Sequence, residues 1–342
     1  MAKKTMKCDK CGKKSVIKLA YGPHYFCEAH FTQFFENRFK KTIRKYNLLK
    51  GGEKLIVALS GGKDSVVTLL LLHKFYSKSN PIEALIIDEG VKGYREKAEE
   101  TAVKNCKKLN IDYKLVSFEE EFGLTNDEIM PLILKNSKLG GTCAFCGTLR
   151  RVLMNKYAKK LKGKKLVTGH NLDDEVQSVV MNIFNNDYEK FKRQDAGAGN
   201  PATKGFVKRI KPLYETPEKE VIAYCAYNSI DNYSDECCPY SWTAKRNEFR
   251  EMINNFETRF PGTEFSILRF FETVKSNLPK TKSKVKILKE CKNCGEPTGQ
   301  KLCNACSQIE KILNEKQKGK SKKVKKNTRY DKCKTCKTTK GN

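Results

Sequence analysis

The sequence predicts an α/β fold, a doubly wound parallel sheet flanked by two small zinc-binding modules. Apolar runs of strand length at 55–59, 84–88, 113–118 and 165–168 alternate with segments of helical periodicity. Strands and helices that alternate in this way form a parallel sheet with helices on both faces. Cysteine pairs with the spacing of metal ligands occur near both ends of the chain, and these predict the two modules.

A polar turn, SGGKDS, follows the first of these strands in the segment Leu55–His73. The apolar run from Val66 has helical length, so the turn joins a buried strand to a helix. Its glycines allow a ligand to approach closely, and the amides at a helix N-terminus favour an anion. The alternative is an ordinary helix start in which Asp64 interacts with the helix dipole. The residues expected to hold phosphate oxygens are Ser60, Gly61, Gly62, Lys63, Asp64 and Ser65.

The chain has 342 residues, enough for an α/β core and small additional modules. Its formal net charge is +29, and the 68 lysine and arginine residues are distributed along the whole sequence. This excess predicts a polyanionic partner, and its even distribution favours a nucleic-acid surface over a single basic tail. A solvated, lysine-rich surface is the alternative.

The sequence has no recognisable secretion signal, and its longest apolar run, 66–72, is too short to cross a membrane. We therefore expect no membrane association and a reducing, cytoplasmic location. In that compartment, paired cysteines are metal ligands more often than disulfides. The fifteen cysteines of the chain are accordingly interpreted first as ligands.

The first module is predicted in residues 1–38. Cys8-x-x-Cys11 and Cys27-x-x-His30 are separated by fifteen residues, a spacing typical of a zinc knuckle. Four protein ligands leave no open coordination position, so this zinc would be structural. Residues 31–46 have helical periodicity and are expected to pack the knuckle on the core, with contact to RNA phosphates as a second interpretation.

The second module is predicted in residues 286–310, as a zinc ribbon of two Cys-x-x-Cys pairs that are eight residues apart. The tail, 311–342, is basic, and its lysine-rich part from Lys316 to Lys326 is expected to be disordered and to contact phosphates. Cys333-x-x-Cys336 in this tail has no second pair, and its role stays open. The ribbon ligands would be Cys291, Cys294, Cys303 and Cys306.

Acidic residues follow two other strands of the predicted sheet. Asp88 and Glu89 end the second strand, and Asp173 and Asp174 follow the fourth strand in the turn 169–175. The carboxyl ends of parallel strands meet at one edge of the sheet, where the SGGKDS loop also lies. The two aspartates of the turn could cap a helix, hold magnesium or position a substrate. Asp88 could meet a nucleotide, a metal or only solvent.

A third cysteine group lies in the middle of the chain. Cys143-x-x-Cys146 opens a predicted helix, whose positive end would stabilise both thiolates. Cys238, in the segment DECCPY, is the best candidate to join them, with Cys237 as the alternative. Three cysteines can hold zinc and a water, or a 4Fe–4S cluster whose fourth iron lacks a protein ligand. A further zinc ion or reduced buried thiols are the simpler interpretations.

Taken together, these motifs resemble the tRNA 2-thiouridine synthetase family, the archaeal and eukaryotic-type tRNA uridine 2-sulfurtransferases of the ATP-pyrophosphatase (PP-loop) superfamily. The resemblance depends on six features in their order along the chain: the knuckle, SGGKDS, Cys143-x-x-Cys146-Gly, GHNLDDE, a late Cys-Pro-Tyr and the ribbon. It implies an adenine nucleotide alpha hydrolase-like core at 39–285 that binds ATP and Mg²⁺. It also implies two structural Zn²⁺ ions and a 4Fe–4S cluster held by Cys143, Cys146 and Cys238.

The resemblance further implies the reaction, in which the C2 oxygen of a tRNA uridine is adenylated by ATP and then replaced by sulfur. The sulfur would come from a ubiquitin-like protein thiocarboxylate or from free sulfide, and the target would be the wobble or the T-loop uridine. The zinc modules could exchange contacts in a homodimer. The catalytic residues would be Lys63, Asp64 and Asp173. Further nucleotide contacts would come from Asp88, Gly169 and Asp174.

Two other functions fit part of the sequence. A lysidine-forming or amide-forming enzyme of the same superfamily would use the loop and ATP without an iron–sulfur cluster, so the three central cysteines argue against it. A non-enzymatic zinc-ribbon RNA-binding protein would use only the charge and the zinc modules, and it would not cleave ATP.

Overall fold

The computed structural model describes residues 6–197, 205–233, 238–278 and 288–318, and the structural statements below refer to these ranges. Cys237, Cys333 and Cys336, whose roles the sequence leaves open, lie outside the described residues. Within the described ranges, no helix is long and apolar enough to cross a membrane.

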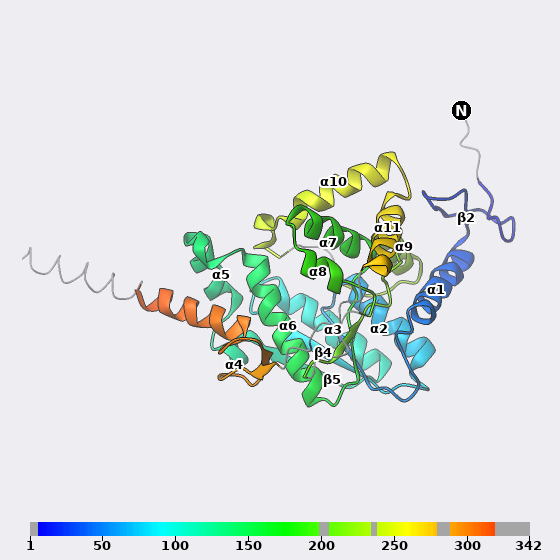
Figure 1. Ribbon diagram of the computed structural model, residues 1–342. Coiled ribbons are helices and arrows are strands. Elements are labelled where there is room, and N and C mark those ends of the chain that lie inside the picture. The colour runs from blue at the N-terminus through cyan, green and yellow to red at the C-terminus, as the bar shows by residue number, and fades with distance from the viewer. Residues whose placement is uncertain (1–5, 198–204, 234–237, 279–287, 319–342) are drawn as a thin grey trace, which may run out of the picture.

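A five-stranded sheet lies at the centre of the molecule (Figure 1), with the strand order β5-β4-β3-β6-β7. Every neighbouring pair of strands is parallel, which confirms the predicted fold class. Phe118 was expected to end β5 but begins a helix, because Ser117 accepts a hydrogen bond from the amide of Glu120 and caps that helix. The strands are β3 (Leu55–Ala58), β4 (Ile82–Asp88), β5 (Tyr113–Ser117), β6 (Lys165–Val167) and β7 (Lys208–Ile210).

The direction of strand addition reverses between β3 and β6. From β3 the sheet continues through β4 to β5 on one side, while β6 and β7 extend it on the other. In doubly wound sheets, ligands bind outside the carboxyl ends of the strands at such a switch point. The SGGKDS loop follows β3 and the GHNLDDE turn follows β6, so the fold brings these two motifs to one place.

Side chains of the strands alternate between two hydrophobic cores. In β3, Leu55 and Val57 belong to one core and Ile56 belongs to the other. Both faces of the sheet are therefore buried under helices. The first core is covered by α2 (Lys63–Tyr76), α3 (Arg95–Leu109), α7 (Leu172–Phe184), α9 (Glu218–Tyr227) and α11 (Thr263–Asn277). The second core is covered by α4 (Phe118–Phe122), α5 (Asn126–Lys135) and α6 (Thr142–Lys160), with the short η1 (Ser137–Leu139) between the last two.

Two further helices pack beside α7, as Figure 1 shows. One of them, α8, is a short helix in the segment that follows α7. Asp187 caps it by accepting a hydrogen bond from the amide of Lys190 at 3.0 Å, which explains why a short helix forms there. The two helices are α8 (Tyr188–Arg193) and α10 (Arg246–Arg259).

The N-terminal module shares the first core instead of forming one of its own. Its helix, α1, crosses the predicted boundary at residue 38 and buries Phe31, Phe35 and Phe39 completely. The ring of Phe35 stacks on Tyr224 of α9, with 4.2 Å between the ring centroids. These phenylalanine side chains thus pack the module on the core, as predicted. The elements of the module are β1 (Ile17–Lys18), β2 (Tyr25–Phe26) and α1 (Glu28–Lys45).

The C-terminal ribbon packs against the second core, which includes its residues Cys291 and Cys303. A single helix at 304–318 follows and passes through the predicted boundary at residue 310. The expectation of disorder from Lys316 onward is therefore wrong for the last described residues. Lys316 pairs with Glu128 of α5 at 2.8 Å, which gives this end of the helix a partner. The ribbon hairpin consists of β8 (Lys289–Glu290) and β9 (Pro297–Thr298).

Candidate active site

The phosphate loop is built on a turn that requires glycine. Gly61 has φ +87°, and a Cβ atom on it would lie 1.9 Å from the carbonyl oxygen of Ala98. The hydroxyl oxygens of Ser60 and Ser65 lie 3.0 Å apart, and Ser65 Oγ also accepts the amide of Ser60 at 3.1 Å. Gly62 is the N-cap residue of α2 and provides no side-chain cap. The first amides of α2 are therefore left for another acceptor, as an anion site requires.

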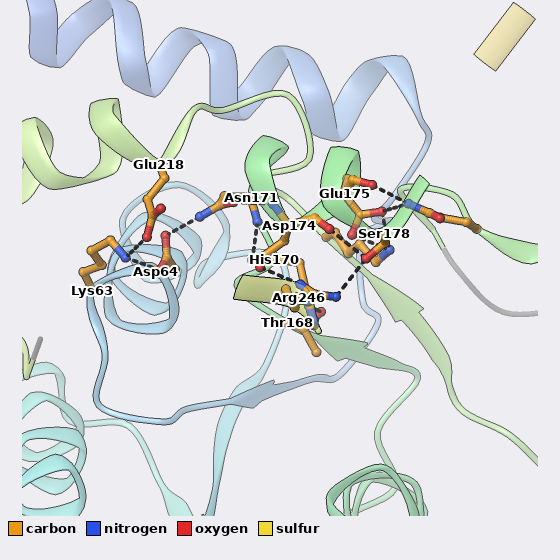
Figure 2. Close-up of polar contacts among 12 residues, drawn as sticks. Lys63, Asp64, Thr168, His170, Asn171, Asp174, Glu175, Ser178, Glu218 and Arg246 are labelled. Carbon is orange, nitrogen blue, oxygen red and sulfur yellow. Dashed lines mark hydrogen bonds and ion pairs between the residues drawn. The ribbon is translucent and has the colours of Figure 1, made fainter. Parts of the chain in front are cut away.

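The turn after β6 lies against this loop. A Cβ atom on Gly169 would lie 2.7 Å from the carbonyl carbon of Asp64, so the absence of a side chain lets the two backbones meet. Asn171 Nδ2 donates a hydrogen bond to Asp64 Oδ1 at 3.0 Å, as Figure 2 shows. The two motifs that the sequence predicted at one edge of the sheet are thus in direct contact.

Lys63 lies between two carboxylates (Figure 2). Its Nζ is 3.0 Å from Asp64 Oδ2 and 2.6 Å from Glu218 Oε1. Burial opposes the charge of Lys63, but the two carboxylates outweigh burial and raise its pKa. The loop therefore keeps a fixed cation at the first position of α2. No local pattern in the sequence indicated Glu218, which reaches Lys63 from 155 residues away.

Asp173 and Asp174 cap two different helices. Asp174 and Asn171 form the capping box of α7, and Asp174 also pairs with Arg246 of α10 at 3.0 Å. Asp173 is buried, and its Oδ2 accepts the amide of Glu218 at 2.7 Å, at the start of α9. Of the roles that the sequence left open, capping is the one visible in these contacts.

A second buried carboxyl group faces Asp173. Glu264 of α11 is 4% exposed, and the charge of Asp173 acts on its carboxyl group. Two neighbouring buried carboxylates repel each other, which favours a proton on one of them. Burial, together with the charge of Asp173, raises the pKa of Glu264 to about 8, and burial raises that of Asp173 to about 6. Glu264 therefore holds the proton at neutral pH.

Asp88 and Glu89, at the end of β4, differ in their contacts. Asp88 Oδ1 accepts the amide of Gly90 at 2.8 Å, which is a turn contact. Glu89 is buried and pairs with Arg95 of α3 at 3.0 Å and with Arg150 of α6 at 3.3 Å. The sequence placed Glu89 on this edge but gave no sign of either arginine.

The cysteine site lies where α6 begins. Cys143 is exposed in the first turn of α6, whereas Cys146 is buried, with Asn126 Nδ2 3.4 Å from its sulfur. Cys238 is partly buried on a segment tied to the same helix, because Thr142 donates a hydrogen bond to the carbonyl of Tyr240 at 3.2 Å. The three cysteines predicted to act together therefore lie in one region.

Burial raises the pKa of Cys146 and of Cys238, and the nearby Arg150 offsets only part of the effect. At Cys146, burial therefore opposes the stabilisation of the thiolate that the helix N-terminus is predicted to give. The three sulfurs are not all within 4.8 Å of one another. A 4Fe–4S cluster, in which each cysteine binds a different iron, does not require its ligands to gather around one ion as zinc does.

The two terminal cysteine groups have the compact arrangement of zinc sites. In each group, all four ligand atoms lie within 4.8 Å of one another. Burial raises the pKa of Cys8 and of Cys291, but backbone amides outweigh it and lower both values to about 6. At these two positions this favours the thiolate form that zinc binds, whereas the pKa values of Cys11, Cys294 and Cys306 are raised. The groups are Cys8, Cys11, Cys27 and His30, and Cys291, Cys294, Cys303 and Cys306.

Replacing Gly61 by alanine should abolish ATP binding. The left-handed backbone costs a non-glycine residue about 1–2 kcal/mol, and the clash with Ala98 must displace the loop. Calorimetric titration with ATP and thermal unfolding would measure both effects. Gly51→Ala is the matched control and should keep wild-type affinity, because a Cβ atom at Gly51 meets nothing within 4 Å. Wild-type affinity in Gly61→Ala would contradict the role of this turn.

Glu264→Gln should flatten the pH dependence of stability. The pKa of Glu264 is raised from 4.5 to about 8 in the folded state, so the folded protein binds this proton more tightly than the unfolded chain. Stability should therefore fall as the pH rises between these values, by at most about 1.4 kcal/mol per pH unit for one proton. Urea unfolding at several pH values would measure the slope. Glu251→Gln, at an exposed position of α10, should keep the wild-type slope, and an unchanged slope in Glu264→Gln would refute the assignment.

Comparisons with known proteins agree with this geometry. Residues 31–257 match the family model described as the PP-loop domain. The chain is 35% identical over 329 residues to the tRNA 2-thiolation protein NcsA of Haloferax volcanii. This alignment covers 90% of this chain and 99% of the relative. It is 36% identical over 301 residues to the tRNA-5-methyluridine(54) 2-sulfurtransferase of Pyrococcus horikoshii. This alignment covers 88% of this chain and 93% of the relative.

A solved structure extends the likeness to three dimensions. The U34-tRNA thiolase NcsA from Methanococcus maripaludis, with its 4Fe-4S cluster, matches with a TM-score of 0.76 at 33% identity. The match covers 90% of this chain and 97% of the other. With the phosphate loop, the central cysteines and these relatives all in agreement, this chain belongs to the PP-loop family of tRNA 2-thiolation proteins.

Proposed function

We propose that this protein is an ATP-dependent tRNA uridine 2-sulfurtransferase. The observation that carries the proposal is the occurrence of two chemically different sites near the carboxyl ends of the strands. An anion-binding loop follows β3, and a group of three cysteines lies at the start of α6, which packs on the neighbouring strand β4. ATP-dependent activation followed by sulfur transfer requires such a pair of sites. The names of the relatives, a tRNA 2-thiolation protein and a tRNA 2-sulfurtransferase, support the same reaction.

The loop at 60–65 would bind the ATP phosphates for the activation step. The C2 oxygen of uridine attacks the α-phosphorus, pyrophosphate leaves, and the oxygen becomes part of an AMP leaving group. Lys63 stabilises the charge that develops on the pyrophosphate. Asp64, whose side chain is 24% exposed, is the carboxylate that we propose for Mg²⁺, which would neutralise the phosphates.

The other residues predicted at the carboxyl edge of the sheet would position the groups that take part in the activation step. Asp173 is better described as a positioning residue than as the catalytic residue expected from the sequence, because it caps the helix from which Glu218 contacts Lys63. Gly169 and Asp174 belong to the turn that packs on the loop, and we keep them as neighbours of the nucleotide. Asp88 remains a predicted nucleotide contact.

The central cysteines would serve the sulfur-transfer step. We propose Cys143, Cys146 and Cys238 as the ligands of a 4Fe–4S cluster. When bound, such a cluster supplies an iron without a protein ligand, where the sulfide to be transferred can be held. Cys143 is exposed, so this side of the site is open to a large substrate. Arg150 Nη2 lies 3.9 Å from Cys146 Sγ and offsets negative charge there. The two terminal groups would hold structural Zn²⁺.

The surface beside the cysteines suits an unstacked RNA base. Trp242, the single tryptophan of the chain, is 72% exposed on η2 (Ser241–Thr243), four residues after Cys238. The exposed Lys245 and Arg250 follow it. Aromatic stacking and basic contacts are how proteins hold single-stranded RNA. One relative is named for position 34 and another for position 54, so the wobble and T-loop uridines are the two targets to test.

The decisive experiment is an anaerobic thiolation assay. Iron-loaded protein, unmodified tRNA, Mg-ATP and sulfide should yield a 2-thiouridine nucleoside that mass spectrometry detects after digestion. The product should depend on ATP, and mapping of the digest would identify the uridine. Sulfide replaces the natural donor, since a ubiquitin-like protein thiocarboxylate and free sulfide both remain predicted. ATP cleavage to AMP without any thionucleoside would overturn the proposal in favour of a lysidine-type enzyme. The predicted homodimer and cytoplasmic location need separate measurements.

The metal assignments predict two complementary variants. Cys143→Ser should lose the iron and abolish thiolation while the zinc content stays unchanged, because its sulfur belongs to neither of the two terminal groups. Cys11→Ser is the matched control and should lose one zinc ion but keep the iron. Elemental analysis and visible absorption of the purified variants would distinguish these outcomes. Full iron content and activity in Cys143→Ser would refute the cluster assignment.

A further inference from the structure

A continuous chain of polar contacts joins the phosphate loop to the cysteine site. Arg95 Nη1 donates a hydrogen bond to the carbonyl of Ser60 at 2.8 Å, and Arg95 Nε forms an ion pair with Glu89 Oε2 at 3.0 Å that lacks the geometry of a hydrogen bond. The other oxygen of this carboxylate, Glu89 Oε1, lies 3.3 Å from Arg150 Nε. Arg150 Nη2 then lies 3.9 Å from Cys146 Sγ. One carboxylate thus connects the backbone of the ATP loop to a ligand of the second site.

Two members of this chain of contacts, Arg95 and Glu89, are buried and need each other's charge, whereas the Arg150 side chain is 45% exposed. Arg95 is 5% exposed and Glu89 is 8% exposed, and a charge buried to this degree is costly unless it is paired. Glu89 uses both of its oxygens, one for each arginine, so it cannot satisfy one partner in a new position without affecting the other. Its carboxylate also raises the pKa of Arg150. A shift at either end should therefore be felt at the other.

This chain of polar contacts also joins elements from both faces of the sheet. Arg95 begins α3, which covers the first core, whereas Arg150 lies on α6, which covers the second. Glu89 directly follows β4, between the two helices. Apolar residues of similar volume stabilise a buried site as well as an ion pair does, so stability alone gives little reason for a charged link here.

We propose that Glu89 is a positioning residue that couples ATP binding at the phosphate loop to the state of the cysteine site, through Arg95 on one side and Arg150 on the other. The inference rests on the proposed function, because it assumes that ATP and a cluster occupy these two sites. Ligand-dependent movement of the Ser60 carbonyl changes the position of Arg95, and the shared carboxylate passes that change to Arg150 beside Cys146. Coupling of this kind is reciprocal, so cluster binding must change the affinity for ATP.

The test compares ATP affinity with and without iron. Calorimetric titration with a non-hydrolysable ATP analogue would be done anaerobically on iron-loaded and iron-free protein. For the wild type we expect dissociation constants that differ at least about fivefold, the lower end of typical couplings. Glu89→Gln keeps the size of the side chain but removes its charge, and it should bring the ratio to about one. Equal affinities in the wild type, or a wild-type ratio in Glu89→Gln, would overturn the proposal.

Two further variants keep this test interpretable. Glu83→Gln is the matched control: Glu83 lies on the same strand and pairs with Lys54 at 2.6 Å, away from both sites. It should keep the wild-type ratio. Arg95→Lys retains the charge but loses the fork that contacts Ser60 and Glu89 together, so its ratio should also fall to about one. This variant decides the matter if Glu89→Gln fails to fold, and a wild-type ratio in Arg95→Lys would then overturn the proposal.

The outcomes separate this inference from the function on which it rests. Protein that binds no iron at the central cysteines, or that makes no thionucleoside, would overturn the proposed function and the coupling together. Wild-type protein that thiolates tRNA, combined with variants that keep the full affinity ratio, would overturn only the coupling.

Discussion

The close approach of Gly169 to the first turn of α2 is the constraint on which the rest of the site depends. Any side chain at this position would collide with the backbone of Asp64, so only glycine allows the turns after β3 and β6 to touch. That contact lets Asn171 hold Asp64 while the same residue caps α7. The switch point of the sheet thereby becomes a rigid anion site, because two helix starts are tied together there.

The first turn of α9 carries this constraint outward to the N-terminal module. Glu218 contacts Lys63. Glu220, two residues further along α9, accepts hydrogen bonds from Tyr21 and Arg38. The knuckle is thus connected to the phosphate loop through two acidic side chains of one helix. This arrangement explains why α1 shares the main core: the module helps to position the helix on which the loop lysine depends.

Local patterns in the sequence predicted much of the fold and of the candidate site. The strands, the strand-to-helix turn and the helix that carries Cys143 in its first turn were predictable because strand burial, glycine conformation and helix starts depend on neighbours a few residues apart. The compact ligand groups of the two ends were predictable for the same reason, since their spacing is short. The roles of Asp173 and Glu89 were not, because their partners are distant in the chain.

The sequence by itself determined the sheet class, the anion loop and the two compact terminal groups of cysteine and histidine, since each of these is encoded in a short, continuous stretch. Only the tertiary structure decided which charges are paired. Lys63 meets Glu218, Asp173 meets Glu264 and Arg95 meets Glu89 across different elements, and burial in that setting sets the pKa of Glu264 and of Cys146. Such pairings follow from how helices pack on the sheet, and packing is a property of the whole chain.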